Sequence, residues 1–549
     1  MDQYPKVFSG LIRPFFCVFF KYKRDNLFIF ELIEGHIGII NVKDGEKMAG
    51  QIGDYLGKKI NGELAQDIKL FRKIFLRDSI LRVREFYAGG DIGKNCAAFY
   101  FDGMVSAAMI NDSVVRPMVN AHIILEDTVT DTDGIADTVM RRVLYANEIS
   151  KTDDLGEMLR AVLYGDTVLL IDGSCEALTI NTKGWQMRSI SEPEDERILE
   201  GPREGFSEAV MINLSLLRRK LQTPDLCIEQ MRIGRRSDTK VYVCYLGALA
   251  SRKTVKRLKL RLSEIDIDGI LDVNYINELV TEKNSALFRN TGSTERPDVV
   301  AARLLEGRVA IFVDGTPMVL TLPYLFAENF QSDEDYYQSY MVSSVGRVLR
   351  YICFFLSISV PAIYVALTVF HRRLLPTSFL LSVAQARQGV PLPSVLECFL
   401  LIVVFEILKE AGVRTQQSLG QALSIVGGLV VGQAAVEAKL VSAPMLIAVA
   451  LSGIAGLMIP RLRGAVFYLR IALLAGSACL GLFGYAAVLS AVLVRIFSLR
   501  SFGSDATPAL AVPSAQRLKD TVVRANMRMM YKRPPFNKNI YRMKRKGRE

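Results

Sequence analysis

Hydrophobic and polar positions divide the chain at about residue 350. Before this point, apolar and charged residues alternate at short range, as they do in the strands and amphipathic helices of globular regions. After it, three long runs are apolar and uncharged: 351–370, 440–460 and 471–494. Runs of this length are typical of helices that cross a membrane. The pattern therefore predicts a soluble α/β N-terminal region followed by an α-helical polytopic membrane domain over residues 346–500.

The soluble region is expected to hold two α/β subdomains, 50–200 and 201–345. In the first, DTVLLIDG (166–173) predicts a buried strand that ends in a turn. In the second, residues 304–323 predict two strands joined at Asp314-Gly315, because Asp-Gly between apolar runs is a strong hairpin signal. Residues 1–49 form an N-terminal extension whose role the sequence leaves open.

Charged side chains interrupt the membrane block between residues 395 and 439. A charge at bilayer depth costs roughly 2.5–3.5 kcal/mol on insertion scales, so such residues occur where they pair, line water or contact a partner. Two interpretations remain open: an intramembrane salt-bridge network, or a cation-attracting ring around a pore formed by several copies. The candidate residues are Glu397, Glu406, Lys409, Glu410, Arg414, Gln433 and Glu437.

Within this set, Glu406 and Glu410 lie four residues apart and share one helix face. Lys409 is adjacent, and Arg414 lies one turn beyond Glu410. Glu397 follows two prolines near the start of a span, so we expect it at the membrane interface rather than in a pore.

Small residues mark a second feature, in segment 420–438. They allow helices to approach closely, as they do at assembly interfaces. The candidate packing positions are Gly420, Gly427, Gly428, Gly432 and Ala435.

Span counting leaves the topology open between four and five membrane segments. Segment 420–438 has only about 16 uncharged residues, fewer than the roughly 20 that a full span needs. Basic residues flank both ends of the membrane block, which favours an even number of crossings. We therefore expect one segment, 420–438, to be re-entrant or part of a broken helix. The candidates are 351–370, 395–411, 420–438, 440–460 and 471–494.

The net charge of +11 is concentrated at the C-terminus. Residues 514–549 hold twelve Lys and Arg and two acids, a net charge of +10. A basic tail directly after a membrane block follows the positive-inside rule and can contact anionic lipid headgroups. This interpretation is favoured over nucleic-acid binding. It places the tail, 501–549, in the cytoplasm, and the absence of a signal peptide predicts the same location for the N-terminal region.

The residues that carry common chemistry are scattered. The eight cysteines form no CxxC pair and the three histidines are isolated, so neither a disulfide framework nor a metal site is expected. Neither Gly-Lys pair completes a Walker motif, and no GxSxG or HExxH occurs. We expect no enzyme activity, no catalytic residue and no cofactor.

Several stretches, in the same order along the chain, resemble one family. They are similar to the A subunits of spore germination receptors, the GerA family, which includes stage V sporulation AF-like members. The resemblance covers roughly residues 50–545. It rests on GPREGFSEAVMINLSLLRRKL (201–221), TERPDVVAARLLEGRVAIFVDGTPMVLTLP (294–323), EILKEAGVR (406–414) and GQALSIVGGLVVGQAAVEAKLVSAP (420–444).

The resemblance implies a nutrient-germinant receptor subunit in the inner membrane of a bacterial spore. Its implied partners are a transporter-like B subunit, a C lipoprotein and further copies of the chain, with a pentamer as the expected ring. Such a ring implies a ligand-gated cation channel. A non-conducting scaffold and an accessory stage V sporulation AF-like channel are the alternatives. Thr415-Gln416 stands where the family has Leu-Pro, and Lys409 replaces an Arg.

Overall fold

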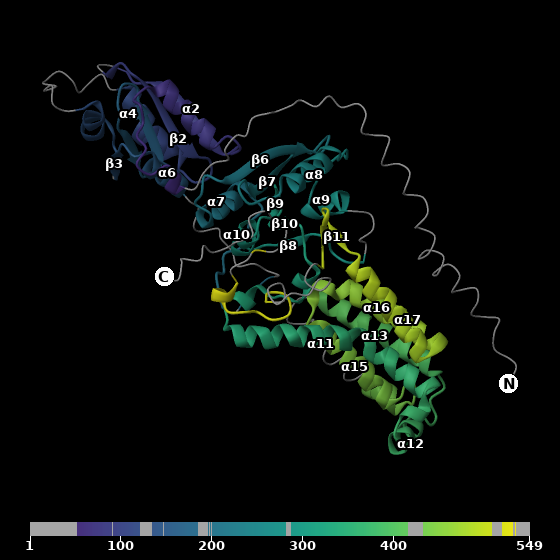
Figure 1. Cartoon of the computed structure of the whole chain (residues 1–549). Helices are drawn as coiled ribbons and strands as arrows, with labels where there is room; N and C mark the ends of the chain where they lie inside the picture. Colours follow the sequence, from purple (N-terminus) through teal and green to yellow (C-terminus); the bar gives the residue numbers. More distant parts are fainter. Residues whose placement is uncertain are drawn as a thin grey trace, which may run out of the picture. The chain divides into compact units, whose positions relative to one another are not determined.

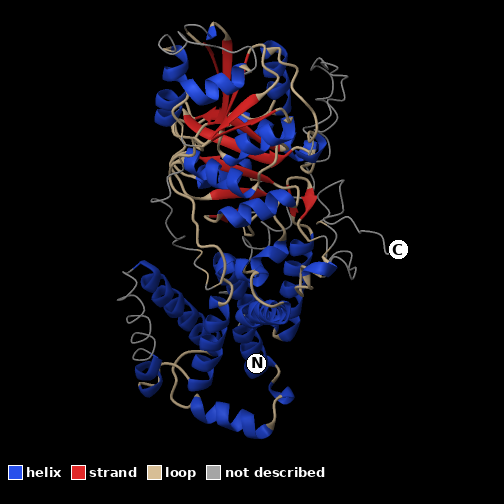
Figure 2. Ribbon diagram, turned by 90° about the vertical axis from the view of Figure 1, so that its left-hand side faces the viewer, coloured by secondary structure: helices blue, strands red, loops and turns tan. Residues whose placement is uncertain are grey.

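An antiparallel α/β region precedes a helical region in the computed structural model, as Figures 1 and 2 show. The described residues all fall in one compact unit, and the extension 1–49 lies outside them. The structure describes residues 52–89, 92–120, 134–146, 148–184, 196, 198, 200–281, 287–414, 432–507, 519–530 and 533.

The first α/β unit, residues 52–184, is built on a five-stranded antiparallel sheet with the order β1-β2-β4-β5-β3. All five residues of β4 are buried, which confirms the strand predicted at 166–173. Its main elements are α2 (Leu64–Ile74), β1 (Leu81–Tyr87), β2 (Asn95–Phe101), β3 (Ile149–Thr152), α6 (Leu155–Tyr164), β4 (Thr167–Ile171) and β5 (Ala177–Ile180), with short helices α3 (Ala107–Ile110), α4 (Arg116–Val119) and α5 (Ile135–Thr138).

The second α/β unit, residues 200–322, has a five-stranded antiparallel sheet with the order β6-β7-β9-β10-β8. The predicted hairpin is confirmed: β9 and β10 pair, and Gly315 in the turn has φ +94°. The elements are α7 (Val210–Lys220), β6 (Leu226–Ile233), β7 (Thr239–Leu246), α8 (Arg252–Ser263), α9 (Val273–Val280), β8 (Gly292–Thr294), α10 (Pro297–Leu305), β9 (Val309–Val313) and β10 (Val319–Leu322).

The two units repeat one plan. Numbered within each unit, the strands of both sheets follow the order first, second, fourth, fifth, third. The turn after the fourth strand is Asp-Gly in both, and its aspartate accepts a hydrogen bond from the first residue of the opening helix. Asp172 Oδ1 accepts from Leu64 N at 3.3 Å, and Asp314 Oδ1 accepts from Val210 N at 3.3 Å. The α/β region is therefore an internal structural duplication.

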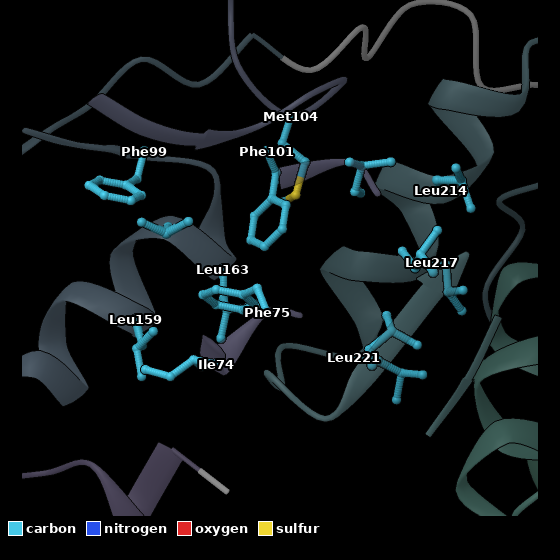
Figure 3. Packing of buried hydrophobic residues seen from close by; sticks show 14 of the residues in the cluster. Ile74, Phe75, Phe99, Phe101, Met104, Leu159, Leu163, Leu214, Leu217 and Leu221 are labelled. Carbon is cyan, nitrogen blue, oxygen red and sulfur yellow. The ribbon is translucent and has the colours of Figure 1, made fainter. Parts of the chain in front are cut away.

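One hydrophobic core joins the two units (Figure 3). Phe99 and Phe101 from the first unit and Leu214 and Leu217 from the second belong to the same buried cluster. Arg218 of α7 is fully buried in contact with this core, where it pairs with Asp78 and lies 4.5 Å from the ring centre of Phe101. Because the units share this core, they are packed together rather than joined only by a linker.

The helical region begins at Tyr340. Two stretches, Tyr340–Phe370 and Pro460–Leu480, are long and apolar enough to cross a membrane, and α12, α15 and α17 are apolar but shorter. The elements are α11 (Tyr340–Val365, extended by η7, Ala366–Phe370), α12 (Thr377–Ala386), α13 (Ser394–Arg414), α15 (Ala443–Leu457), α16 (Arg463–Leu480) and α17 (Leu482–Phe497).

The segment expected to cross without interruption, 471–494, is not one helix. Gly481 adopts φ +61° and ψ −136° and separates α16 from α17. A Cβ on Gly484 would lie 2.0 Å from the carbonyl oxygen of Gly476, so the two backbones touch. The prediction of one uninterrupted helix over this run is therefore wrong, because the run contains a tight helical hairpin.

Contacts at the helix ends fix the direction of each helix. Glu410 near the end of α13 lies 3.1 Å from Arg463 at the start of α16. Glu397 at the start of α13 binds Ser442, which precedes α15, and a Cβ on Gly481 would touch the ring of His371 beyond α11. α11 and α16 therefore run away from the α/β region, and α13, α15 and α17 run back. We call the two ends of this bundle the junction end and the distal end.

Candidate functional site

A cluster of buried charges joins the second α/β unit to the helices. Arg308, the first residue after Gly307, is 1% exposed. Its guanidinium donates to Glu306 Oε2 at 3.0 Å and to the Pro323 carbonyl at 3.0 Å, and it pairs with Glu328. Arg303 of α10 lies 3.0 Å from Glu328 Oε2. Buried pairs of this kind tolerate poorly the loss of one partner.

The first turns of α11 lie in a second part of the same cluster. Asp335 Oδ2 accepts from Arg347 Nε at 2.8 Å and from Arg350 Nη1 at 2.9 Å. Arg347 also donates to the carbonyl and the carboxylate of Asp520, at 2.9 and 3.0 Å. Burial raises the pKa of Asp520, and the nearby Arg347 opposes that rise. The C-terminal segment is thereby attached to the start of α11.

Arg461, directly before α16, completes the connection. It donates to the carbonyls of Glu328 and Gln331 at 3.2 and 3.3 Å and lies 3.2 Å from Asp333. The loop after β10, the starts of α11 and α16, and residues 519–524 are therefore held in one network, which we call the charged junction. The second α/β unit is thus attached to the starts of both helices.

The charges predicted in the bundle lie mainly on α13. Glu406 and Lys409 form an ion pair at 3.0 Å, with side chains 23% and 17% exposed. Glu410 pairs instead with Arg463 of α16. Arg414 is the last residue of α13, and its side chain lies outside the described part of the structure.

Glu397 is fully buried at the distal end of the bundle. One carboxylate oxygen accepts hydrogen bonds from the Ser442 amide and hydroxyl, both at 2.6 Å. Arg387, after α12, lies 3.7 Å from the other oxygen. Ser442 is the N-cap of α15, so the carboxylate of Glu397 lies at the N-terminus of this helix, where the helix dipole favours negative charge.

The remaining predicted residues are placed only in part. Gln433 donates to Glu437 at 3.0 Å, on an exposed surface. Ala435 packs against the cluster that contains Met445, and a Cβ on Gly432 would lie 3.5 Å from the Leu446 side chain. These small residues thus contact α15 of the same chain. Gly420, Gly427 and Gly428 lie outside the described residues.

Arg470 was not predicted, although it is buried in the middle of α16. It is 3% exposed and donates to the carbonyls of Ser357 at 3.0 Å and Ser452 at 3.2 Å. It thereby connects α11, α15 and α16. Its signal in the sequence was a single arginine between FYL and IALL, which marked the edge of an apolar run.

Among the described residues, no group of three or more His, Cys, Asp or Glu side chains is placed so that it could hold a metal ion. The described cysteines are free thiols rather than disulfides.

Comparison with known proteins gives one consistent family. The model of the Bacillus/Clostridium GerA spore germination protein matches residues 69–536. Spore germination protein KA of Bacillus subtilis (strain 168) is 37% identical over 86% of this chain and 87% of its own length. Spore germination protein B1 of the same organism is 32% identical over 87% of this chain and 98% of its own length.

Two further similarities concern the membrane and the N-terminal region. A Bacillus subtilis protein described as uncharacterized membrane protein YfkQ is 37% identical over 81% of this chain and 86% of its own length. The N-terminal domain of the A subunit of the Bacillus megaterium spore germinant receptor GerK3 is 30% identical, covering 49% of this chain and 98% of that domain, with a TM-score of 0.37. From the family match and the long relatives, the chain belongs to the GerA family of spore germination proteins.

Proposed function

We propose that this chain is the A subunit of a nutrient-germinant receptor in the spore inner membrane, where several copies assemble into a ligand-gated cation channel. Family membership supports the role in germination. By the same resemblance, a transporter-like B subunit and a C lipoprotein are its partners. The α/β region and both chain termini lie in the cytoplasm, and the charged junction passes the signal from that region to the helices.

The charged residues of α13 are the main support for the proposed channel. Within one copy, Glu406 and Lys409 keep 23% and 17% of their side chains exposed and Glu410 keeps 50%, although neighbouring helices are apolar. Facing lipid, each charge would cost several kcal/mol. Further copies of the chain, or water held between them, relieve this cost, and a ring of acids then favours cations.

The helix directions support a topology of six passes. With 471–494 divided at Gly481, the five candidate segments become six, and both flanks return to one side without a re-entrant segment. At 1.5 Å per residue, α16 is about 27 Å long, close to the roughly 30 Å of a hydrocarbon core. The hairpin tip then reaches the outer face.

Two native cysteines test this topology. Cys479 is exposed beside the hairpin tip, and Cys175 is exposed in the first α/β unit. In intact cells, a membrane-impermeant maleimide should label Cys479 and spare Cys175, which should react only after permeabilisation. Labelling of Cys175 from outside, or of Cys479 only from inside, would contradict the proposed orientation.

Ion flux tests the channel itself. The complete receptor in liposomes should release K⁺ or Na⁺ when the germinant is added, and Glu406→Gln should change the ratio of their permeabilities. Glu176→Gln is the matched control, because Glu176 forms a comparable pair with Lys151 in the first α/β unit, at 3.4 Å. An assembled receptor that passes no ions would indicate the scaffold alternative instead.

A further inference from the structure

The first half of α11 carries an apolar face that nothing in the described chain covers. Figure 1 shows this half of the helix extending beyond the packed bundle. Its opposite face holds Arg347 and Arg350 against Asp335, so the helix cannot turn its apolar side inward. The exposed residues are Met341, Val342, Val345, Val348, Leu349, Ile352 and Phe355.

Lipid alone does not account for this face. The stretch Tyr340–Phe370 has 31 residues and is therefore about 46 Å long, against a hydrocarbon core of roughly 30 Å. Even at a tilt of about 40°, the upper end of the usual range, it would cover about 35 Å. The excess lies at the junction end, since the distal end stops at His371-Arg372-Arg373. The first exposed positions thus lie outside the hydrocarbon core.

The spacing of the face is that of a helix–helix contact. Met341, Val345, Val348, Ile352 and Phe355 follow intervals of 4, 3, 4 and 3 residues, the heptad spacing of coiled coils. With Val342 and Leu349, the apolar face has three positions per heptad, as is typical of helices in bundles. Copies in one membrane share an orientation, so their α11 helices are parallel.

The area of the face is sufficient for a stable contact. With Met341 67% and Val345 70% exposed, the seven side chains present on the order of 700 Å² per copy, close to the about 800 Å² that each partner contributes to a standard interface.

We propose that this face of α11 packs against the same face of α11 in neighbouring copies, on the cytoplasmic side of the membrane. The inference rests on the proposed function, in which the chain assembles with itself. It also places the assembly contact next to the charged junction, so that the cytoplasmic signal and the subunit contact act on the same helix.

Disulfide cross-linking tests the contact directly. The background is the full chain with serine at Cys175 and Cys479, which are exposed, and at Cys17, which lies outside the described residues. In native membranes with a mild oxidant, Val345→Cys should give a disulfide-linked dimer of this chain. Val494→Cys on α17 is the matched control, with 69% exposure against 70%, and should stay at least tenfold less cross-linked.

A second variant separates this inference from the proposed function. Val345→Asp, at an exposed position, should leave the chain folded but reduce the oligomer fraction in nanodiscs at least tenfold, whereas Val345→Leu should retain it. An oligomer that survives Val345→Asp, or cross-links from Val345→Cys only to a different protein, would overturn the α11 contact while leaving the channel intact. Absence of flux from an intact, cross-linked oligomer would instead overturn the channel.

Discussion

The two α/β units share one topology but differ in the residue that follows the helix-ending glycine. In the first unit Gly165 is followed by Asp166, which pairs with Lys183 at 2.8 Å on a partly exposed surface. In the second, Gly307 is followed by Arg308, which is buried against Glu306 and Glu328. The two units thus have matching positions after this glycine. Only in the second unit does the residue at that position contact the loop that leads into the helical region.

This difference indicates how a repeated domain can divide its roles. The glycine turns and helix-start contacts that maintain the fold are kept in both units, whereas the side chains at one matching position determine which unit connects to the helical region. The following substitutions compare matched positions in the two units.

The largest effect is expected at Arg308. Arg308→Leu leaves Glu328 buried with one guanidinium fewer, which should cost about 3–5 kcal/mol of folding free energy. Asp166→Asn at the matching position loses a partly exposed pair and should cost at most about 1 kcal/mol. Thermal unfolding of the purified full chain in detergent measures both. Equal losses at the two positions would remove the distinction between the units.

Asp225 should make the second unit sensitive to pH. Burial raises its pKa to about 6, whereas the matching residue in the first unit is Ile80. Because the folded state binds this proton more tightly than the unfolded state, stability should increase as the pH falls from about 7 to 4. The gain should be about 3 kcal/mol for a shift of two pKa units.

The isosteric variant Asp225→Asn isolates this effect. It keeps an acceptor for the Ala248 amide but cannot titrate. Urea unfolding between pH 4 and 7, monitored in the second unit, should show a flatter dependence on pH for the variant than for the native chain. Parallel curves would assign the dependence to other groups.

The helix-ending glycines should behave alike in both units. Gly165 and Gly307 have φ +102° and +89°, where a side chain is strained by roughly 1–2 kcal/mol. Gly165→Ala and Gly307→Ala should therefore destabilise the chain by similar amounts in thermal unfolding. Gly53→Ala is the control, since a Cβ there meets no atom within 4 Å. A large difference between the first two would weaken the interpretation of the units as repeats.

The smallest effect is expected at the Asp-Gly turns. Asp172→Ala and Asp314→Ala each remove the acceptor for the first amide of a helix, and loss of such a cap costs about 1 kcal/mol. Hydrogen exchange should accelerate at Leu64 N in one variant and at Val210 N in the other. Asn at either position retains an oxygen and should preserve most of the protection.

The sequence predicted local elements better than their arrangement. The β9–β10 hairpin could be predicted because Asp314-Gly315 lies between two β-branched runs. The duplication leaves a local signal, since 163–180 and 305–322 align without a gap and share Gly165 with Gly307, Thr179 with Thr321 and the Asp-Gly turn, but the elements before these stretches show little identity. Topology is conserved here by burial and turn geometry, which a wide range of side chains satisfies.

The bundle shows where hydropathy alone is insufficient. A window over 471–494 averages across Gly481 and cannot distinguish one span from a hairpin, since both are equally apolar. The apolar run 471–494 begins directly after Arg470, although backbone carbonyls satisfy this arginine inside the bundle. The candidates Gly420, Gly427 and Gly428 lie outside the described residues, so their packing role stays a prediction.

The α16–α17 hairpin is anchored at both ends to one short loop. Arg461 before it binds the carbonyls of Glu328 and Gln331, and Ser501 after it accepts a hydrogen bond from the Tyr324 amide at 3.0 Å. One anchor would leave the base of the hairpin free to swivel, but two hold both of its ends to the loop. Because Arg470 also bonds α16 to α11 and α15, a tilt of this loop is passed to all three helices rather than to the hairpin alone.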